Sequence, residues 1–89
     1  METKYRYLIK GAERKGDYKD YLRRLSTVVI ETHCTIRQAA KAFGHPKSTI
    51  YRDLTVGLLD NALDRQYADI QIIFRENHEA WYHRGRRAK

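Results

Sequence analysis

Apolar positions recur along most of the chain with the spacing of helices rather than of strands. After Asp17, a good N-cap residue, they follow steps of three and four residues over about four helical turns. The residues on this face are Tyr18, Tyr21, Leu22, Leu25, Val28, Val29 and Thr32. Ile30 falls outside the face. The pattern predicts a long amphipathic helix that packs one side against a core.

Two shorter helices follow in the pattern. The first has Thr35 as its N-cap candidate and Gly44 at its end, where a glycine commonly terminates a helix. Its inward face consists of Ile36, Ala39, Ala40 and Phe43. Pro46 marks the start of the second helix, because a fixed φ and a missing N–H cost little in a first turn. We expect Gly57 to end this second helix.

The second short helix has a thin apolar stripe, in which only Ile50 and Leu54 are firmly apolar. Ala40 is small where the two helices must approach each other, and Gly44 permits a left-handed turn residue. Two short helices joined within a few residues have the spacing of a helix-turn-helix. A generic helical hairpin is the alternative.

The two ends of the chain differ in pattern. Asp60 or Asn61 is expected to cap a last, long helix. Its inward face would hold Leu63, Tyr67, Ile70, Ile73, Phe74, Asn77 and Trp81, with Ile72 on the opposite side. At the other end, residues 1–16 interleave basic residues with Tyr5, Tyr7, Leu8 and Ile9. This segment is expected to form an extended arm or a short strand, either packed on the domain or frayed.

Charge points to the class of partner, because the formal net charge is +7 and the pI is near 9.8. A polyanion is the leading partner, nucleic acid first and an acidic membrane surface second. No apolar run reaches the roughly 20 residues that span a bilayer, and the N-terminus lacks the features of a signal peptide. The single cysteine, Cys34, cannot form an internal disulfide. We therefore expect a cytoplasmic, nucleoid-associated protein.

The second short helix carries the main candidates for DNA binding. With Ile50 and Leu54 inward, Arg52 and Ser48 point outward, and such side chains match base edges and phosphates. Asp53 would repel phosphate, so we expect it to pair with a nearby arginine. The glycine-hinged, basic C-terminus suits phosphate contact or a narrow minor groove. The candidates are Lys47, Ser48, Thr49, Tyr51 and Arg52 on this helix, Thr35, Arg37 and Lys41 on the helix before it, and Arg84, Arg86 and Arg87 in the tail.

These features together predict the fold class and its divisions. One proline and five glycines favour helices over a turn-rich β fold, and 89 residues suffice for one modest core. We expect an all-α fold, a small helical domain with a helix-turn-helix, a long C-terminal helix and a basic tail. Its parts are an N-terminal arm at 1–16, a helix-turn-helix DNA-binding domain at 17–83 and a basic C-terminal tail at 84–89.

Other chemistries find little support in the sequence. His78 and His83 are five residues apart, so they do not share a helix face as a zinc pair at a spacing of four would. No Gly-rich phosphate loop and no paired carboxylates appear, and so short a chain rarely encloses an active site. We expect no metal, no cofactor, no small-molecule ligand and no enzymatic activity. Cys34 is expected to be a small packed residue rather than a nucleophile.

The stretch TIRQAAKAFGHPKSTIYRDL resembles the stage III sporulation protein D family of endospore-forming bacteria. The resemblance begins near Asp17, with DYKDYLRRLSTVVIETH, and runs to the RG at 84–85; KSTIYRDL is its most specific part. It implies a small transcription regulator of the mother cell that activates some sporulation promoters and represses others. It also implies a recognition helix in the major groove, assisted by a basic C-terminal segment. Those roles would fall on Lys47, Ser48, Thr49, Tyr51 and Arg52, and on Arg84, Arg86 and Arg87.

Two features depart from the family pattern. Pro46 stands where such motifs usually have a serine N-cap, so a capping hydrogen bond worth about 1 kcal/mol is expected to be absent. The first sixteen residues have no counterpart in the family, so their role is not implied by the resemblance.

The predicted function is that of a sequence-specific double-stranded DNA-binding transcription regulator, an activator, a repressor or both. RNA polymerase is a candidate protein partner, and we expect a monomer or a weak dimer. Two alternatives fit the same features. One is a non-specific or architectural DNA-binding module, such as a transposase or recombinase arm, and the other is a helical protein-interaction adaptor for an acidic partner. RNA fits less well, because the A-form major groove is too narrow for a helix.

Overall fold

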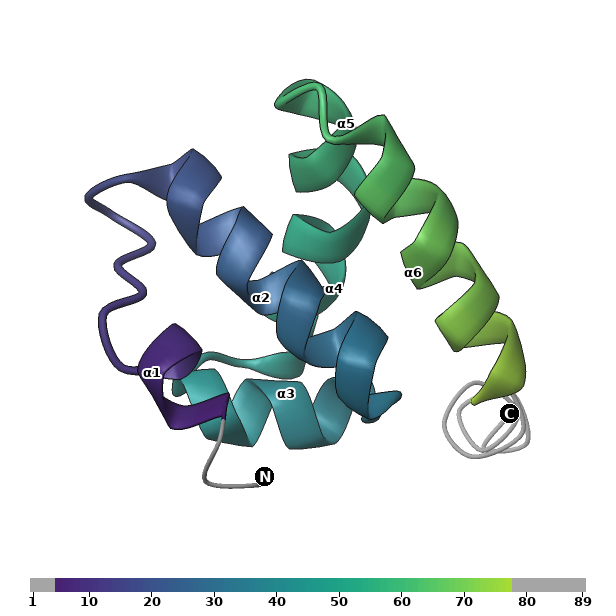
Figure 1. Ribbon diagram of the computed structural model, residues 1–89, viewed down its shortest axis with the longest axis horizontal. Coiled ribbons are helices and arrows are strands. Elements are labelled where there is room, and N and C mark those ends of the chain that lie inside the picture. Colours follow the sequence, from purple (N-terminus) through teal and green to yellow (C-terminus); the bar gives the residue numbers. More distant parts are fainter. Residues whose placement is uncertain (1–4, 78–89) are drawn as a thin grey trace.

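Every regular element of the described structure is helical (Figure 1). The computed structural model describes residues 5–77. Its elements are α1 (Arg6–Ile9), α2 (Tyr18–Thr32), α3 (Ile36–Phe43), α4 (Lys47–Arg52), the π-helical turn η2 (Asp53–Gly57), α5 (Leu58–Asp60) and α6 (Asp64–Glu76). Residues 5–77 contain no strand, which confirms the predicted all-α fold.

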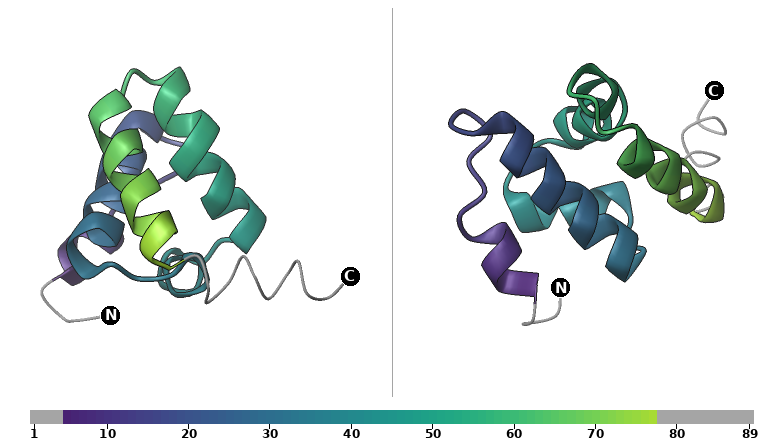
Figure 2. Two further views of the ribbon diagram at one scale, coloured as in Figure 1. Left: turned by 90° about the vertical axis from the view of Figure 1, so that its right-hand side faces the viewer. Right: turned by 45° about the horizontal axis from the view of Figure 1, so that its top comes forward.

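Helix α2 supplies the centre of the hydrophobic core. Asp17 caps it as predicted, because the side chain accepts a hydrogen bond from the Asp20 amide at 3.0 Å. The inward residues of α2 pack against those of the other helices, which surround it in Figure 1 and Figure 2. The buried cluster comprises Tyr21, Leu22, Leu25, Val29, Cys34, Ile36, Ala39, Ala40, Ile50, Leu54, Leu58, Leu63, Ile70 and Ile73. The apolar stripe that follows Asp17 is therefore the face on which α3, α4 and α6 assemble.

Helices α4 and α5 are two parts of one continuous helix, joined by η2. The prediction that Gly57 ends this helix is wrong. The φ of Gly57 is −59°, and the Asn61 amide donates to the Gly57 carbonyl at 3.2 Å, so the helical bonding continues past the glycine. The chain leaves the helix only at Asn61 and Ala62, and Ala62 has a positive φ of 59°.

Helix α6 returns along the core to the loop between α2 and α3. The prediction that Asp60 or Asn61 caps it is wrong, because Asp60 belongs to α5 and the N-cap is Leu63, which makes no side-chain cap bond. Leu63 is buried instead, so its contribution is to packing. At the other end of α6, the Asn77 amide donates to the carbonyls of His33 and Cys34 at 3.3 and 3.4 Å. Trp81, the last predicted member of the stripe, lies outside the described residues.

The N-terminal arm contains a short helix, α1, where we expected an extended segment or a strand. Helix α1 rests against α2, and Tyr5 at its N-cap is buried, with 7% of its surface exposed. Arg24 of α2 donates from Nη1 to the Tyr7 carbonyl at 3.0 Å and to the Leu8 carbonyl at 3.2 Å. These contacts satisfy carbonyls at the end of α1 that have no helical partner, which favours a helical turn over an extended chain.

The two apolar residues outside the predicted stripes have different surroundings. Ile30 is half-buried and packs against the edge of the core, whereas Ile72 on α6 is exposed by 51%. Tyr7 of the arm is exposed by 71%, so the arm buries only part of its apolar surface.

Candidate nucleic-acid interface

The turn between α3 and α4 depends on Gly44. Its φ is 72°, in the left-handed region that favours glycine. Its amide donates to the Ala40 carbonyl at 2.9 Å, and the His45 amide donates to the same carbonyl at 3.0 Å. No heavy atom lies within 4 Å of the position that a Cβ would take. The backbone conformation, rather than crowding, therefore requires a glycine between these two helices.

A capping box fixes the start of α3. Thr35 Oγ1 accepts a hydrogen bond from the Gln38 amide at 3.2 Å, and Gln38 Oε1 accepts one from the Thr35 amide at 2.9 Å. The predicted capping role of Thr35 is confirmed. Thr35 is also a candidate DNA contact, and the cap leaves its hydroxyl proton available to a further acceptor such as a phosphate oxygen.

Helix α4 separates a buried side from an exposed side. Ile50 and Leu54 are fully buried, as the thin apolar stripe predicts. Pro46 occupies the N-cap without a side-chain hydrogen bond, also as expected. The remaining side chains of the helix are available to solvent: Lys47, Ser48, Tyr51 and Arg52 are exposed, and Thr49 is half-buried.

Tyr51 occupies one edge of this exposed side. Its ring stacks on that of Phe74 of α6, with the centroids 5.8 Å apart and the planes 13° apart. The tyrosine nevertheless keeps 45% of its surface exposed. The contact restricts the ring and fixes the direction of its exposed edge.

Basic residues are exposed on α3 as well as on α4. Arg37 and Lys41 are exposed on α3, as Lys47 and Arg52 are on α4. Residues 36–52 contain no aspartate or glutamate, so these four cations face no acid within their own segment. Exposed charges of one sign raise the local potential and attract a polyanion. We refer to the side chains of Arg37, Lys41, Lys47, Ser48, Tyr51 and Arg52 as the basic face.

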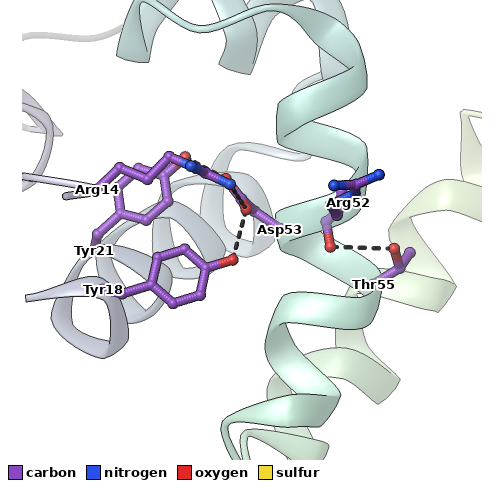
Figure 3. A network of polar contacts seen from close by, with 6 residues as sticks. All are labelled: Arg14, Tyr18, Tyr21, Arg52, Asp53 and Thr55. Atoms are coloured by element: carbon purple, nitrogen blue, oxygen red, sulfur yellow. Dashed lines mark hydrogen bonds and ion pairs between the residues drawn. The ribbon is translucent and has the colours of Figure 1, made fainter.

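The carboxylate beside Arg52 is withdrawn from this face (Figure 3). Asp53 is fully buried and accepts hydrogen bonds from Arg14 Nε at 2.9 Å, Arg14 Nη2 at 3.0 Å, Tyr18 Oη at 2.6 Å and Tyr21 Oη at 2.8 Å. The predicted pairing of Asp53 with an arginine is confirmed. A buried carboxylate is tolerated only when it is paired and hydrogen-bonded. These four bonds therefore allow an acid in this helix without exposing its charge.

Burial and the shared carboxylate keep the donors of this network protonated. Burial first, and then the hydrogen bond donated to Asp53, raises the pKa of Tyr18 to about 12. The same two causes, in the same order, raise the pKa of Tyr21. The hydrogen bond to Asp53 is the main cause that raises the pKa of the Arg14 guanidinium. Arg14 also lies over the Tyr18 ring, with Cζ 5.4 Å from the centroid, which adds a cation–π contact.

The π-helical turn η2 begins at Asp53, which lies three residues after Ile50 and so already faces the buried side. The Leu58 amide donates to the Asp53 carbonyl, five residues back, so the turn holds more residues than an α turn. It thereby rotates Leu58 back toward the line of Ile50 and Leu54, while Asp53 and Gly57 both face α2. A Cβ on Gly57 would lie 2.6 Å from Tyr18 Oη. Glycine at this position therefore lets the Tyr18 hydroxyl reach Asp53.

Sequence reasoning did not find the donors of this network. Tyr18 and Tyr21 were predicted as inward residues of α2, but their hydroxyls were given no partner. Arg14 lies in the segment GAERKG, which has no helical periodicity, so no local pattern assigns it a direction. The position of Asp53 could have predicted such partners. An acid next to Leu54 on an inward face needs a cation and hydrogen-bond donors from elsewhere in the chain.

Three further observations concern metal binding, the cysteine and the membrane. Residues 5–77 contain no group of three or more metal-ligating side chains. Cys34 is buried and burial raises the pKa of its thiol, as befits a packed residue. Among those residues, no helix is both long and apolar enough to cross a bilayer. Three of the predicted DNA contacts, Arg84, Arg86 and Arg87, lie outside the described structure.

Comparison with known proteins identifies the family. Neither the curated proteins nor the solved structures give a significant match to the chain. The family model described as stage III sporulation protein D matches residues 17–89, which include all of the basic face, Asp53 and both tyrosines that bind it. Arg14 and α1 precede the matched segment. The match extends over far more than half of the sequence, and the chain belongs to the stage III sporulation protein D family.

Proposed function

We propose that the protein is a sequence-specific double-stranded DNA-binding transcription regulator that acts during sporulation. In this proposal α4, here called the recognition helix, enters the major groove with Arg52 and Ser48 toward base edges. Lys47 contacts a phosphate at the N-terminal end of the helix, and Thr49 and Tyr51 line its sides. Family membership supports a DNA-binding regulator, and the exposed side chains of α4 support this assignment of the reading surface.

One observation carries the proposal furthest, namely the contrast between Arg52 and Asp53. Arg52 is exposed, whereas the acid next to it is fully buried and bonded to an arginine. An exposed carboxylate at that position would repel the DNA backbone. Residues 36–52 contain only basic and neutral side chains, and the burial of Asp53 keeps the next residue from adding an exposed acid, which suits a polyanion.

Secondary contacts would position the protein on the duplex. Arg37 and Lys41 on α3, together with the free hydroxyl proton of Thr35, suit phosphates that flank the groove. Arg84, Arg86 and Arg87 would contact phosphate or the wall of the minor groove. Activation, repression and any contact with RNA polymerase would depend on where the bound site lies in a promoter.

Selection of bound duplexes from a random pool at fixed salt tests the proposal. The selected duplex and a scrambled duplex of equal length and composition are then compared by fluorescence anisotropy. A regulator should prefer the selected duplex by about 10³-fold or more. Similar, salt-sensitive affinities for both would favour the architectural module, and a lack of salt-sensitive binding to either would favour the protein-interaction adaptor.

A further inference from the structure

We propose that Arg14 is a positioning residue for DNA recognition. In this role the N-terminal arm, residues 5–16, braces the recognition helix from behind and fixes the direction in which Arg52 points. The inference rests on the proposed function, since it concerns how the recognition helix is held. It adds a part of the chain that precedes the segment matched by the family model.

The contact between arm and helix is specific in geometry. Arg14 donates from Nε to Asp53 Oδ2 and from Nη2 to Asp53 Oδ1, at 2.9 and 3.0 Å. Two parallel bonds between a planar guanidinium and a carboxylate fix relative orientation as well as distance. Asp53 has no exposed surface, while the Arg14 side chain is exposed by 33%. Among residues 5–77, Arg14 is the cation that pairs with this carboxylate, and the other two donors are neutral hydroxyls.

The arm is anchored at its other end as well. Tyr5 at the N-cap of α1 is buried, and Arg24 of α2 donates through Nη1 to the Tyr7 and Leu8 carbonyls of α1. Arg24 is held in turn by Asp20, with Nε 2.8 Å from Oδ2. Because the arm is fixed at both ends, it can hold Asp53 in place relative to α2. A segment attached only at Arg14 could instead move together with Asp53.

The position of Asp53 makes this brace relevant to base reading. It directly follows Arg52 and begins the π-helical turn, where the register of the helix changes. Without Arg14, the buried carboxylate would retain only the Tyr18 and Tyr21 hydroxyls and would be driven toward water. Any rotation that moved it outward would turn Arg52 with it. A recognition surface tolerates only about 0.5 Å or 10–20° of such displacement.

The main experiment compares Arg14→Ala with Lys15→Ala in the full-length protein. Lys15 is the neighbouring residue, carries the same charge and is exposed, so its variant controls for loss of charge in the arm. Binding to the selected and to the scrambled duplex is measured across a salt series, at a temperature where circular dichroism shows each variant folded. We expect Arg14→Ala to reduce the ratio of selected to scrambled affinity by roughly tenfold or more. Lys15→Ala should change this ratio by less than about twofold.

A rescue variant separates positioning from direct contact with DNA. The double substitution Arg14→Ala with Asp53→Asn removes the unpaired charge, so it should recover a large part of the selectivity that Arg14→Ala loses. The salt slope of Arg14→Ala should equal that of the parent, because Arg14 is not expected to touch phosphate. The proposal is overturned if Arg14→Ala keeps its selectivity, if it weakens both duplexes equally with a shallower salt slope, or if the double variant is no better than Arg14→Ala.

Amide hydrogen exchange without DNA tests the brace independently of the proposed function. In Arg14→Ala, amides of residues 50–60 should lose at least about tenfold in protection relative to those of α6, and Lys15→Ala should leave this relation unchanged. An equal loss in both helices would overturn the positioning role. A parent protein that lacks duplex preference refutes the proposed function instead, and the exchange data then still decide whether Arg14 holds the helix.

Discussion

Arg52 and Asp53 are neighbours in sequence, but their side chains point in different directions from the helix (Figure 3). The Asp53 carboxylate points toward α2 and the N-terminal arm, where four hydrogen bonds surround it. The Arg52 side chain points away from that cluster and is exposed. The adjacent charged residues of KSTIYRDL therefore have different surroundings. The aspartate is in the interior and the arginine is at the surface.

Replacing Arg52 with alanine should impair specific binding without unfolding the protein. If the side chain forms two hydrogen bonds with a guanine, its loss should cost about 1–3 kcal/mol and relax specificity at one base pair. Anisotropy titrations on the selected duplex and on single-base variants of it measure both effects. Thermal unfolding should remain close to that of the parent, because the guanidinium lies outside the core.

Two control variants separate loss of a DNA contact from loss of charge and from loss of stability. Arg65→Ala removes an equally exposed arginine from α6 and should leave specific binding nearly unchanged. Leu54→Ala, in contrast, empties a fully buried position and should lower the free energy of unfolding by about 2–5 kcal/mol. If Arg52→Ala binds the selected duplex as tightly as the parent does, the assignment of the reading surface is wrong.

Removing residues 84–89 should weaken binding to all duplexes by similar factors. The segment carries Arg84, Arg86 and Arg87, which we propose to contact phosphates or the minor-groove wall. Each lost phosphate contact should reduce the log–log salt slope by about one unit. A variant with the three arginines changed to glutamine keeps the chain length and should behave like the deletion. An unchanged slope would mean that the segment makes no phosphate contact.

Gly57→Ala should destabilise the fold although alanine favours helices. On an open helix surface the change would stabilise by up to about 1 kcal/mol. Here the new Cβ would lie 2.6 Å from Tyr18 Oη and 3.4 Å from Leu22 Cδ2, so the hydroxyl must leave its bond to Asp53. We expect a net loss of about 1–3 kcal/mol in denaturant unfolding. In a Tyr18→Phe background the penalty should shrink, and a penalty of the same size there would argue against this mechanism.

Stability should fall at alkaline pH because Tyr18 and Tyr21 hold their protons more tightly in the fold than in the unfolded chain. A tyrosine of the unfolded chain titrates near pH 10, whereas burial and the bond to Asp53 raise the pKa of Tyr18 to about 12 in the fold. The folded state therefore retains a proton that the unfolded state has lost. The resulting stabilisation is complete below about pH 10 and is lost as the pH rises toward 12, by up to about 1.4 kcal/mol per pH unit for each proton.

Denaturant unfolding between pH 8 and 12 measures this loss. Tyr18→Phe should be less stable than the parent at pH 8, because Asp53 loses a donor, but its decline with pH should be shallower. Tyr7→Phe is the matched control, since Tyr7 is exposed by 71%. An alkaline decline in Tyr18→Phe as steep as that of the parent would show that this phenol does not contribute.

Local sequence patterns predicted much of the fold, because each pattern lies within a single helix or turn. The stripe of α2, the Thr35 cap, the turn at Gly44 and the inward pair Ile50 and Leu54 all depend on residues a few positions apart. The errors occurred where distant contacts override local preference. Gly57 resembles a helix terminator, but the approach of Tyr18 from α2 requires a glycine inside the helix. The start of α6 was misplaced because Leu63 is selected by burial rather than by capping.

In the candidate site, too, local patterns predicted some features and distant contacts determined others. A helical wheel is sufficient to place Arg52 outward, since it needs only the positions of Ile50 and Leu54. It cannot supply the partners of Asp53, because Arg14 is 39 residues away in the chain and lies in a segment without periodicity. The wheel also assumes regular α geometry, whereas η2 alters the register after Arg52. A need for an arginine was predictable, but not which arginine.

The bond between Asn77 and the carbonyls of His33 and Cys34 has a consequence for the end of the chain. It holds residue 77 beside the loop that leads into α3, so the chain that follows starts from one known point. Seven residue steps separate Asn77 from Arg84, which limits the span between their Cα atoms to about 25 Å. If α4 occupies a groove as proposed, the terminal arginines would be confined to phosphates within that distance, which raises their effective concentration. Weak individual contacts would then be enough to add to the binding of DNA. Their contribution would depend on the position of Asn77 as much as on the arginines themselves.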